Sequence, residues 1–144
     1  MLGQPSAGWS RNSVTRIGVS AFHNCASLTS VTMGNKVTSV GEEAFRGCTS
    51  LTSITIPGSV TSIGQFAFYG THLVGVYCKG NAPSADSSVF SGATSATVYY
   101  LPGTTGWGTS LGGRPTALWV LPNPLILSSS PSFGVHTNGF GFII

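Results

Sequence analysis

The sequence contains very few charged residues. Asp, Glu, Lys and Arg make up 6% of its 144 residues, whereas soluble domains carry about a quarter. The formal charge of +3 comes from six scattered cations, no two of them adjacent. A protein that binds nucleic acid needs a basic stripe or patch, so we expect no nucleic acid among the partners of this chain.

Long apolar runs and an even set of cysteines are also missing. The longest apolar stretch, residues 117–127, is interrupted by Pro122 and Pro124, and it is well short of the roughly 20 residues that a membrane-spanning helix needs. We therefore expect no membrane insertion. The three cysteines are an odd number, which argues against a complete disulfide framework.

Residues of the kinds that carry enzyme chemistry are scarce. Glycoside hydrolysis requires two carboxylates on either side of one bond, but the acids are the neighbours Glu42 and Glu43 and the distant Asp86. The sequence has no phosphate-binding glycine loop, nucleophile elbow or zinc-ligand spacing. We predict no enzyme activity, no catalytic residues, no cofactor and no metal. The three histidines occupy unrelated positions, namely His23, His72 and His136.

Serine, threonine and glycine take the place of charge. Ser and Thr together fill about a quarter of the chain, and there are 20 glycines. Ser and Thr side chains compete with helical backbone hydrogen bonds, and Gly costs about 1 kcal/mol relative to Ala in a helix interior. The composition therefore favours short β-strands joined by turns.

A repeat runs through the first two thirds of the chain. The pattern Val-Thr-x-(Ile or Val)-Gly begins at Val14, Val37 and Val60, which sets the units 23 residues apart. An Ala-Phe pair follows at the same place in each unit. The third unit then loses one residue at 71–73, and a degenerate fourth unit keeps a 22-residue spacing. Units in register over this length identify a repeat protein.

Each unit is interpreted as one coil of backbone. In the second unit, Ile54 and Ile56 face one side and Thr55 faces the other, which is the alternation of a short half-buried strand. The Pro-Gly pair at 57–58 closes that strand with a turn. Gly64 is expected to allow a sharp bend through a positive φ, and the Ala-Phe segment is expected to form a tight turn or one 3-10 turn.

Stacking would bury the apolar side that a single coil leaves exposed. The sequence therefore predicts a mainly β solenoid of about four coils, with short strands and 3-10 turns. Equivalent residues of successive coils should then stack in buried columns. The predicted structural columns are Phe22, Phe45, Phe68 and Phe90; Leu28, Leu51 and Leu73; and Cys25 and Cys48.

The cysteine column has two interpretations. Cys25 and Cys48 should sit one strand spacing apart, about 5 Å, so they could form a disulfide or bind a metal. Alternatively they are small apolar side chains in a buried ladder, a role that suits free cysteine. The lack of a Cys-x-x-Cys motif or of a zinc-spaced His–Cys pair favours the buried ladder.

The outward side of the main strands is the most promising surface. Two coils should present Ser and Thr there, and the next two should present Tyr77 and Tyr99 side by side. An exposed aromatic pair can stack on a sugar or anchor a partner, although the two rings could instead only stabilise the sheet. The candidate ligand-binding residues are Tyr77, Tyr99, Thr55 and Thr32. The predicted outward positions are Ser30, Thr32, Ser53, Thr55, Gly75, Tyr77, Thr97 and Tyr99.

The unit Val-Thr-Ser-Ile-Gly-x-x-Ala-Phe-x-x-Cys-x-x-Leu-Thr-Ser-Ile-Thr-Ile-Pro resembles the BspA-type leucine-rich repeat. The resemblance covers residues 14–101, and residues 77–119 resemble the terminal unit and cap of many bacterial surface proteins of this kind. It departs from the pattern at Thr71, where the repeated cysteine is missing. The resemblance implies a right-handed solenoid that is located at the cell surface or is extracellular. It also implies a role in adhesion or protein binding and supplies no catalytic residues.

We expect three segments. Residues 1–119 form the repeat solenoid with its C-terminal cap, in which Trp107 and Trp119 cover the last apolar coil. Residues 120–131 form a linker, and residues 132–144 are the truncated start of a second β domain. The predicted function is a surface interaction module that binds protein or carbohydrate along its sheet face. The alternatives are a structural spacer that presents a neighbouring domain, or an accessory repeat region of a larger secreted hydrolase.

Overall fold

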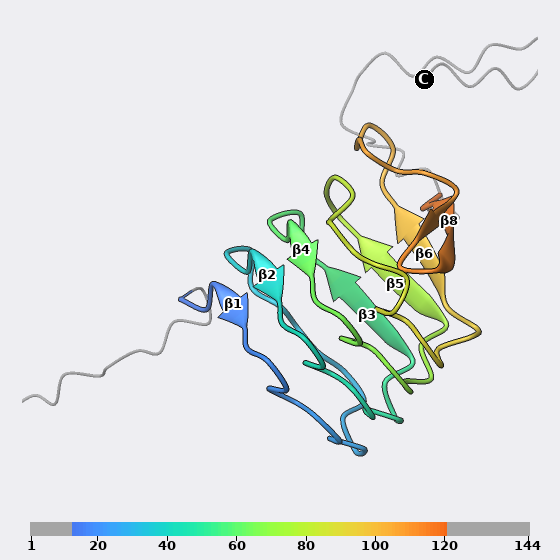
Figure 1. Cartoon of the computed structure of the whole chain (residues 1–144). Helices are drawn as coiled ribbons and strands as arrows, with labels where there is room; N and C mark the ends of the chain where they lie inside the picture. The colour runs from blue at the N-terminus through green and yellow to red at the C-terminus, as the bar shows by residue number, and fades with distance from the viewer. Residues whose placement is uncertain (1–12, 121–144) are drawn as a thin grey trace, which may run out of the picture.

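The chain winds as a solenoid of short β-strands. The computed structural model describes residues 13–120, and every regular element in that part of the chain is a strand. About five turns of the solenoid are visible where the repeat predicts about four (Figure 1). The corners are closed by i→i+3 hydrogen bonds of the 3-10 type, such as the bond from His23 N to Ser20 O at 3.1 Å. The predicted mainly β solenoid is confirmed.

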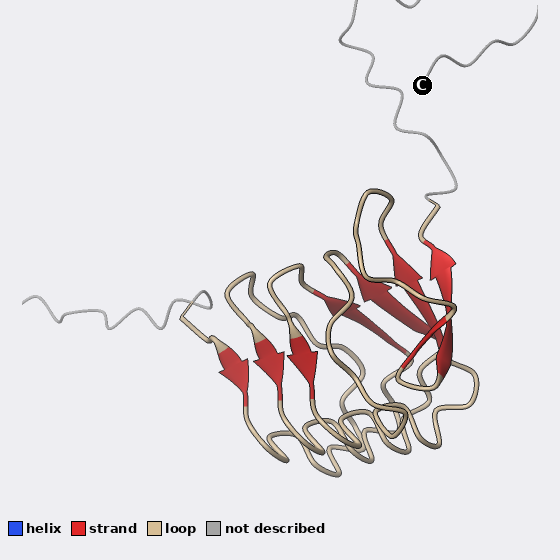
Figure 2. Ribbon diagram, turned by 45° about the horizontal axis from the view of Figure 1, so that its top comes forward, coloured by secondary structure: helices blue, strands red, loops and turns tan. Residues whose placement is uncertain are grey.

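The strands form two stacks on different sides of the coils (Figure 2). Their bounds are β1 Arg16–Ile17, β2 Ser39–Val40, β3 Ser53–Ile56, β4 Ser62–Ile63, β5 Gly75–Cys78, β6 Thr97–Tyr100, β7 Ser110–Leu111 and β8 Arg114–Leu118. The small sheet pairs β1, β2 and β4 in parallel. The large sheet pairs β3, β5, β6 and β8 in parallel, with β7 antiparallel at its edge.

Neighbouring coils pair one repeat apart, and the register follows the length of the repeat. In the small sheet Ser39 pairs with Ser62, 23 positions on, whereas in the large sheet Thr55 pairs with Tyr77 and Tyr77 with Tyr99, 22 positions on. The shortening predicted from the sequence is therefore confirmed. Because every pair stays in register, equivalent side chains of successive coils lie directly beside each other.

The deletion in the third unit leaves its coil regular. Thr71 stands where the earlier units have cysteine, and it is buried. Its hydroxyl donates a hydrogen bond to the Phe68 carbonyl oxygen at 2.9 Å, so the buried polar group is satisfied. Leu73 follows in the core as the leucine of that unit.

A stack of four phenylalanine rings lies along the middle of the core. The ring centroids are 5.1 Å apart from Phe22 to Phe45, 5.4 Å from Phe45 to Phe68 and 5.3 Å from Phe68 to Phe90, with nearly parallel planes. These spacings follow the strand separation of about 4.7–4.9 Å. Phe45 and Phe68 are fully buried, whereas Phe22 in the first coil is 37% exposed.

The first coil differs from the prediction because it has a neighbour on one side only among the described residues. Cys25 is exposed, so the prediction that it is buried is wrong, and Leu28 is half-buried. Residues 27–34, predicted to include the first strand of the large sheet, form no strand, so Ser30 and Thr32 lie in an irregular segment. A terminal coil has half of the interfaces that hold an internal one.

The last coil is covered by the hairpin of β7 and β8. Its turn residue Gly112 has a φ of 58°, and a Cβ there would lie 2.7 Å from the ring of Phe90, so the bare backbone closes the phenylalanine stack. Trp107 packs against the core and stacks on Tyr100 at 4.8 Å between ring centroids, as expected of a cap residue. Leu111 packs there too.

The prediction that Trp119 also covers the last coil is wrong. Trp119 follows β8, and its ring lies against Tyr77 on the opposite, outer side of the large sheet. The predicted linker beyond Val120 and the second β domain at 132–144 lie outside the described residues.

Candidate functional site

The large sheet separates the core from a distinct outer face. On β3, β5 and β6 the side chains of Ile54, Val76 and Val98 are buried in the core. The alternate residues Thr55, Tyr77 and Tyr99 are half-buried and paired side by side across the three strands. The structure therefore brings three of the four predicted ligand-binding residues into one row. It leaves out the fourth, Thr32, because the segment of Thr32 does not join the sheet.

Three aromatic residues form a cluster on this face, which we call the aromatic cluster: Tyr77, Tyr99 and Trp119. The rings of Tyr77 and Tyr99 stack at 5.3 Å between centroids with 15° between their planes. Trp119 meets Tyr77 at 5.0 Å and is tilted by 46°. The backbone N–H of Trp119 donates to the Tyr100 carbonyl oxygen at 2.7 Å, which ties the end of β8 to β6.

Sequence reasoning missed Trp119 as part of this surface. Its signal lies in the strand period of two, because Ala117 pairs with Tyr99 and Trp119 comes two residues later. The segment that contains it includes Pro115, which disfavours a strand within a sheet. In the structure that proline lies in β8, paired with Ser110 of β7. This strand was therefore not predicted from the sequence.

Gly75 sets the position of the Tyr77 ring. A Cβ on Gly75 would lie 2.8 Å from the Tyr77 hydroxyl oxygen and ring carbon Cε2, so the ring lies over the bare glycine. Gly75 is buried although its side faces outward. The Tyr77 ring therefore covers the outward position that Gly75 occupies.

The three cysteines are free thiols in different surroundings. Burial raises the pKa of the Cys78 thiol to about 12. Burial, and next the neighbouring Cys25, raise the pKa of Cys48, while a hydrogen bond from the Cys25 backbone acts in the opposite direction. A nucleophilic cysteine needs a lowered pKa and access, so neither Cys48 nor Cys78 has the character of a catalytic nucleophile.

Raising the pH is expected to destabilise the fold through Cys78. The thiol has an ordinary pKa of 9.0 in the unfolded chain and of about 12 in the folded chain. Between these values the unfolded chain loses the proton first, so stability that is complete below pH 9.0 falls by about 1.4 kcal/mol per pH unit. Urea denaturation across this range measures the slope. Cys78→Ala is the comparison that isolates this thiol, and equal slopes in both proteins would contradict the prediction.

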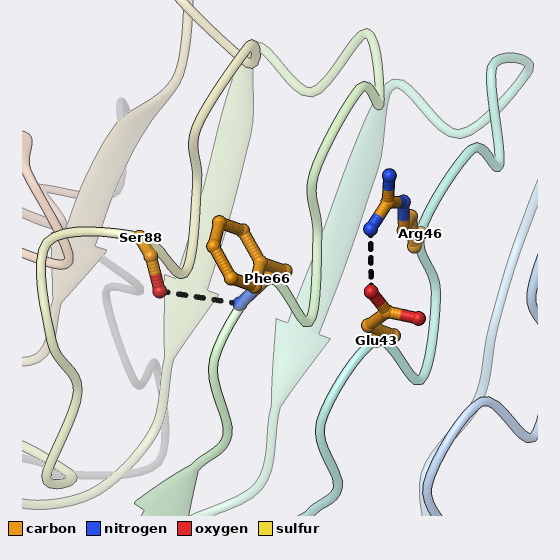
Figure 3. A network of polar contacts seen from close by, with 4 residues as sticks. All are labelled: Glu43, Arg46, Phe66 and Ser88. Atoms are coloured by element: carbon orange, nitrogen blue, oxygen red, sulfur yellow. Dashed lines mark hydrogen bonds and ion pairs between the residues drawn. The ribbon is translucent and has the colours of Figure 1, made fainter.

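Polar groups elsewhere on the surface serve the corners of the coils. The Arg46 guanidinium forms an ion pair with Glu43, and the Phe66 N–H donates to the Ser88 hydroxyl at 3.3 Å (Figure 3). The Arg46 guanidinium also lies 4.8 Å from the centroid of the Tyr69 ring. An ion pair at a solvent-exposed corner contributes about 0–1 kcal/mol. This network therefore stabilises corners and assembles no reactive group.

Asp86 also serves a corner. The hydroxyl and the N–H of Ser88 donate to its carboxylate and lower the pKa of Asp86.

Within residues 13–120 no group of three His, Cys, Asp or Glu side chains could hold a metal ion. His23 and His72 lie on different coils and both are exposed, and His136 lies outside the described residues.

Neither of two hollows that the described residues line borders the aromatic cluster. The larger, about 660 Å³, lies at the open end of the first coil between Ile17, Phe22 and Met33. The smaller, about 280 Å³, lies beside His72 and Ala93.

Residues 13–120 contain no helix long and apolar enough to cross a membrane.

Comparison with known proteins assigns the repeat. The family model described as "BspA type Leucine rich repeat region (6 copies)" matches residues 11–108, more than half of the chain. No curated protein and no solved structure matches the chain. The match includes the coils that carry the phenylalanine stack and the strands that carry Tyr77 and Tyr99. The chain therefore belongs to the BspA-type leucine-rich-repeat family.

Proposed function

We propose that this protein is a non-catalytic interaction module at the cell surface that binds a partner on the outer face of its large sheet. The repeat family supports an interaction module in general. The observation that carries the proposal is the aromatic cluster, in which rings from β5, β6 and the end of β8 gather on one partly exposed surface. Such clusters of Tyr and Trp provide much of the binding energy at protein surfaces.

The polar residues beside the aromatic cluster favour a neutral ligand. Ser53, Thr55 and Thr97 line the outer face of β3 and β6, and β3, β5 and β6 contain no charged residue. Within these three strands the face offers hydroxyl groups and aromatic rings but no charged side chain, so stacking and hydrogen bonds are its main means of binding. A carbohydrate, or an uncharged protein surface, matches that chemistry.

A structural role is the second candidate, and the Tyr77–Tyr99 stack favours it. Two rings that stack across neighbouring strands contribute roughly 0.2–1 kcal/mol to the sheet without any ligand. The chain would then be a spacer that presents a neighbouring domain, or an accessory repeat region of a larger secreted hydrolase. Binding and stability measurements on the same variants separate the two candidates.

Replacing both Tyr77 and Tyr99 with serine is expected to weaken binding about tenfold or more. A hot-spot aromatic residue contributes about 2 kcal/mol or more to the binding free energy, and a tenfold change in affinity corresponds to about 1.4 kcal/mol. A glycan array and a panel of matrix proteins identify the ligand, and titration calorimetry compares wild type, the double variant and Trp119→Ala. Tyr69→Ser is the matched control, since Tyr69 is an exposed aromatic residue at a corner.

Unchanged affinity in the double variant would remove the aromatic cluster from the binding site. A fall in stability together with unchanged affinity would support the spacer role instead. Equal losses in Tyr69→Ser and in the double variant would also contradict the proposal, because Tyr69 lies off the sheet face.

A further inference from the structure

The first two coils bring Cys25 and Cys48 to equivalent places in neighbouring turns. Two backbone hydrogen bonds between the coils flank the pair. The Asn24 N–H donates to the Arg46 carbonyl oxygen at 2.7 Å on one side, and the Ser50 N–H donates to the Ala26 carbonyl oxygen at 3.2 Å on the other. The two cysteines are therefore held side by side by the backbone rather than placed together by chance.

The buried thiol points at the coil of the exposed one. The Cys48 Sγ donates to the Phe22 carbonyl oxygen at 3.1 Å. The Cys25 N–H donates to the same oxygen at 3.2 Å, so the Cys48 sulfur and the Cys25 backbone meet at one atom. The effect of Cys25 on the pKa of Cys48, after that of burial, reflects the same proximity.

We propose that Cys25 and Cys48 form an intercoil disulfide when the protein meets an oxidant of the disulfide class such as oxidised glutathione. The two coils are joined by backbone hydrogen bonds on both sides of the pair, and hydrogen-bonded neighbouring backbones lie about 4.7–4.9 Å apart. A disulfide spans about 4.4–6.8 Å between Cα atoms. The bond would join the terminal coil of the described residues to the next one. The buried ladder needs both side chains in the core, and Cys25 is exposed.

The reaction proceeds by two thiol–disulfide exchanges. The Cys25 thiolate attacks one sulfur of oxidised glutathione, forms a mixed disulfide and releases one glutathione thiolate. The raised pKa keeps the thiolate fraction of Cys48 small, but the second exchange is intramolecular because Cys48 lies beside Cys25. The Cys48 thiolate then attacks the Cys25 sulfur and displaces the second glutathione. The protein loses two protons and two electrons, and one oxidised glutathione becomes two reduced molecules. Cys25 reacts first because it is exposed, and Cys48 resolves the intermediate because it lies beside it.

Cys78 does not take part. It is buried in the large sheet, paired in register with Ile56 and Tyr100. No cysteine precedes it at the equivalent place, since its partner position in β3 is an isoleucine. It therefore serves as an internal reference thiol that remains reduced.

The test treats the folded protein with oxidised glutathione, stops the exchange with acid, alkylates the remaining thiols in denaturant and measures the mass, because the buried Cys78 thiol reacts only after unfolding. The expected product has lost two hydrogen atoms, joins the peptides of Cys25 and Cys48, and carries the alkyl group on Cys78 alone. Amide exchange in residues 13–33 is expected to slow in the oxidised protein, because the bond holds the terminal coil to its neighbour. Reduction with dithiothreitol should restore the original exchange.

Two variants make the result decisive. Cys48→Ser should stop at the mixed disulfide between Cys25 and glutathione, whereas Cys78→Ser should form the same internal bond as wild type. Wild-type protein that stops at the glutathione adduct, or that forms only intermolecular dimers through Cys25, would overturn the proposal. Formation of the internal bond only after unfolding in urea would overturn it as well, because the native geometry would then not be its cause.

Discussion

Replacing Phe45 with alanine is expected to lower the free energy of unfolding by about 3–5 kcal/mol. The side chain is fully buried, and its ring lies between Phe22 at 5.1 Å and Phe68 at 5.4 Å. Removing the ring leaves a cavity in the middle of the stack and takes away two ring contacts at once. Urea denaturation measures the loss, and the m-value shows whether the array still unfolds as one unit.

The matched control for this experiment is Phe22→Ala. Phe22 occupies the equivalent place one coil earlier. It is 37% exposed, and among the described residues it stacks on the Phe45 ring alone. Because solvent can fill the space that its ring leaves, the loss should be less than half of that for Phe45. Equal losses would contradict the view that burial within the stack, rather than ring stacking itself, holds the coils together.

The repeat predicts the phenylalanine stack because register and side-chain identity are linked in a solenoid. Once the units pair one repeat apart, every equivalent residue must lie beside its counterpart. The same logic predicts that Tyr77 and Tyr99 are neighbours and that the spacing shortens after the deletion at 71–73. These features need no information beyond the period, and so the sequence alone determines them.

The ends of the solenoid are where prediction from the period fails. A repeat does not say how many neighbours a coil has, so Cys25 and Phe22 were expected to be buried like their counterparts, and both are exposed. Outside the repeat no period is available at all. The position of Trp119 depends on the pairing of β8 with β6. The sequence did not indicate β8 as a strand, because it contains Pro115.

The reason expected from the sequence for the glycine that follows the short strand of each unit is also wrong. A positive φ was expected at Gly64, but the left-handed residues of that coil are Phe66, with a φ of 54°, and Gly70, with a φ of 65°. At Gly64 the cause is a close approach of two backbones instead. A Cβ there would lie 2.5 Å from the Glu42 nitrogen, a distance that real side chains do not reach. Sequence pattern cannot separate these two reasons for glycine.

Replacing Gly64 with alanine is therefore expected to destabilise the solenoid by about 3 kcal/mol, the upper end of the usual range for overpacking. The added methyl group meets the backbone of the preceding coil, 2.8 Å from the Gly41 carbonyl carbon, and a backbone cannot turn away as a flexible side chain can. The two coils must separate at this corner, which weakens the hydrogen bond of 2.8 Å from the Gly64 N–H to the Val40 carbonyl oxygen. Thermal and urea denaturation of the variant measure the effect.

Gly18→Ala is the control, because Gly18 occupies the equivalent place in the first coil and a Cβ there has nothing within 4 Å. It should change stability little. Gly41→Ala should behave like Gly64→Ala, since its Cβ would lie 2.6 Å from the Gly18 carbonyl carbon. If all three variants lost the same stability, the cause would be the intrinsic cost of replacing glycine in that conformation. Only a loss confined to positions 41 and 64 identifies contact between neighbouring backbones as the reason that each internal coil needs its glycine.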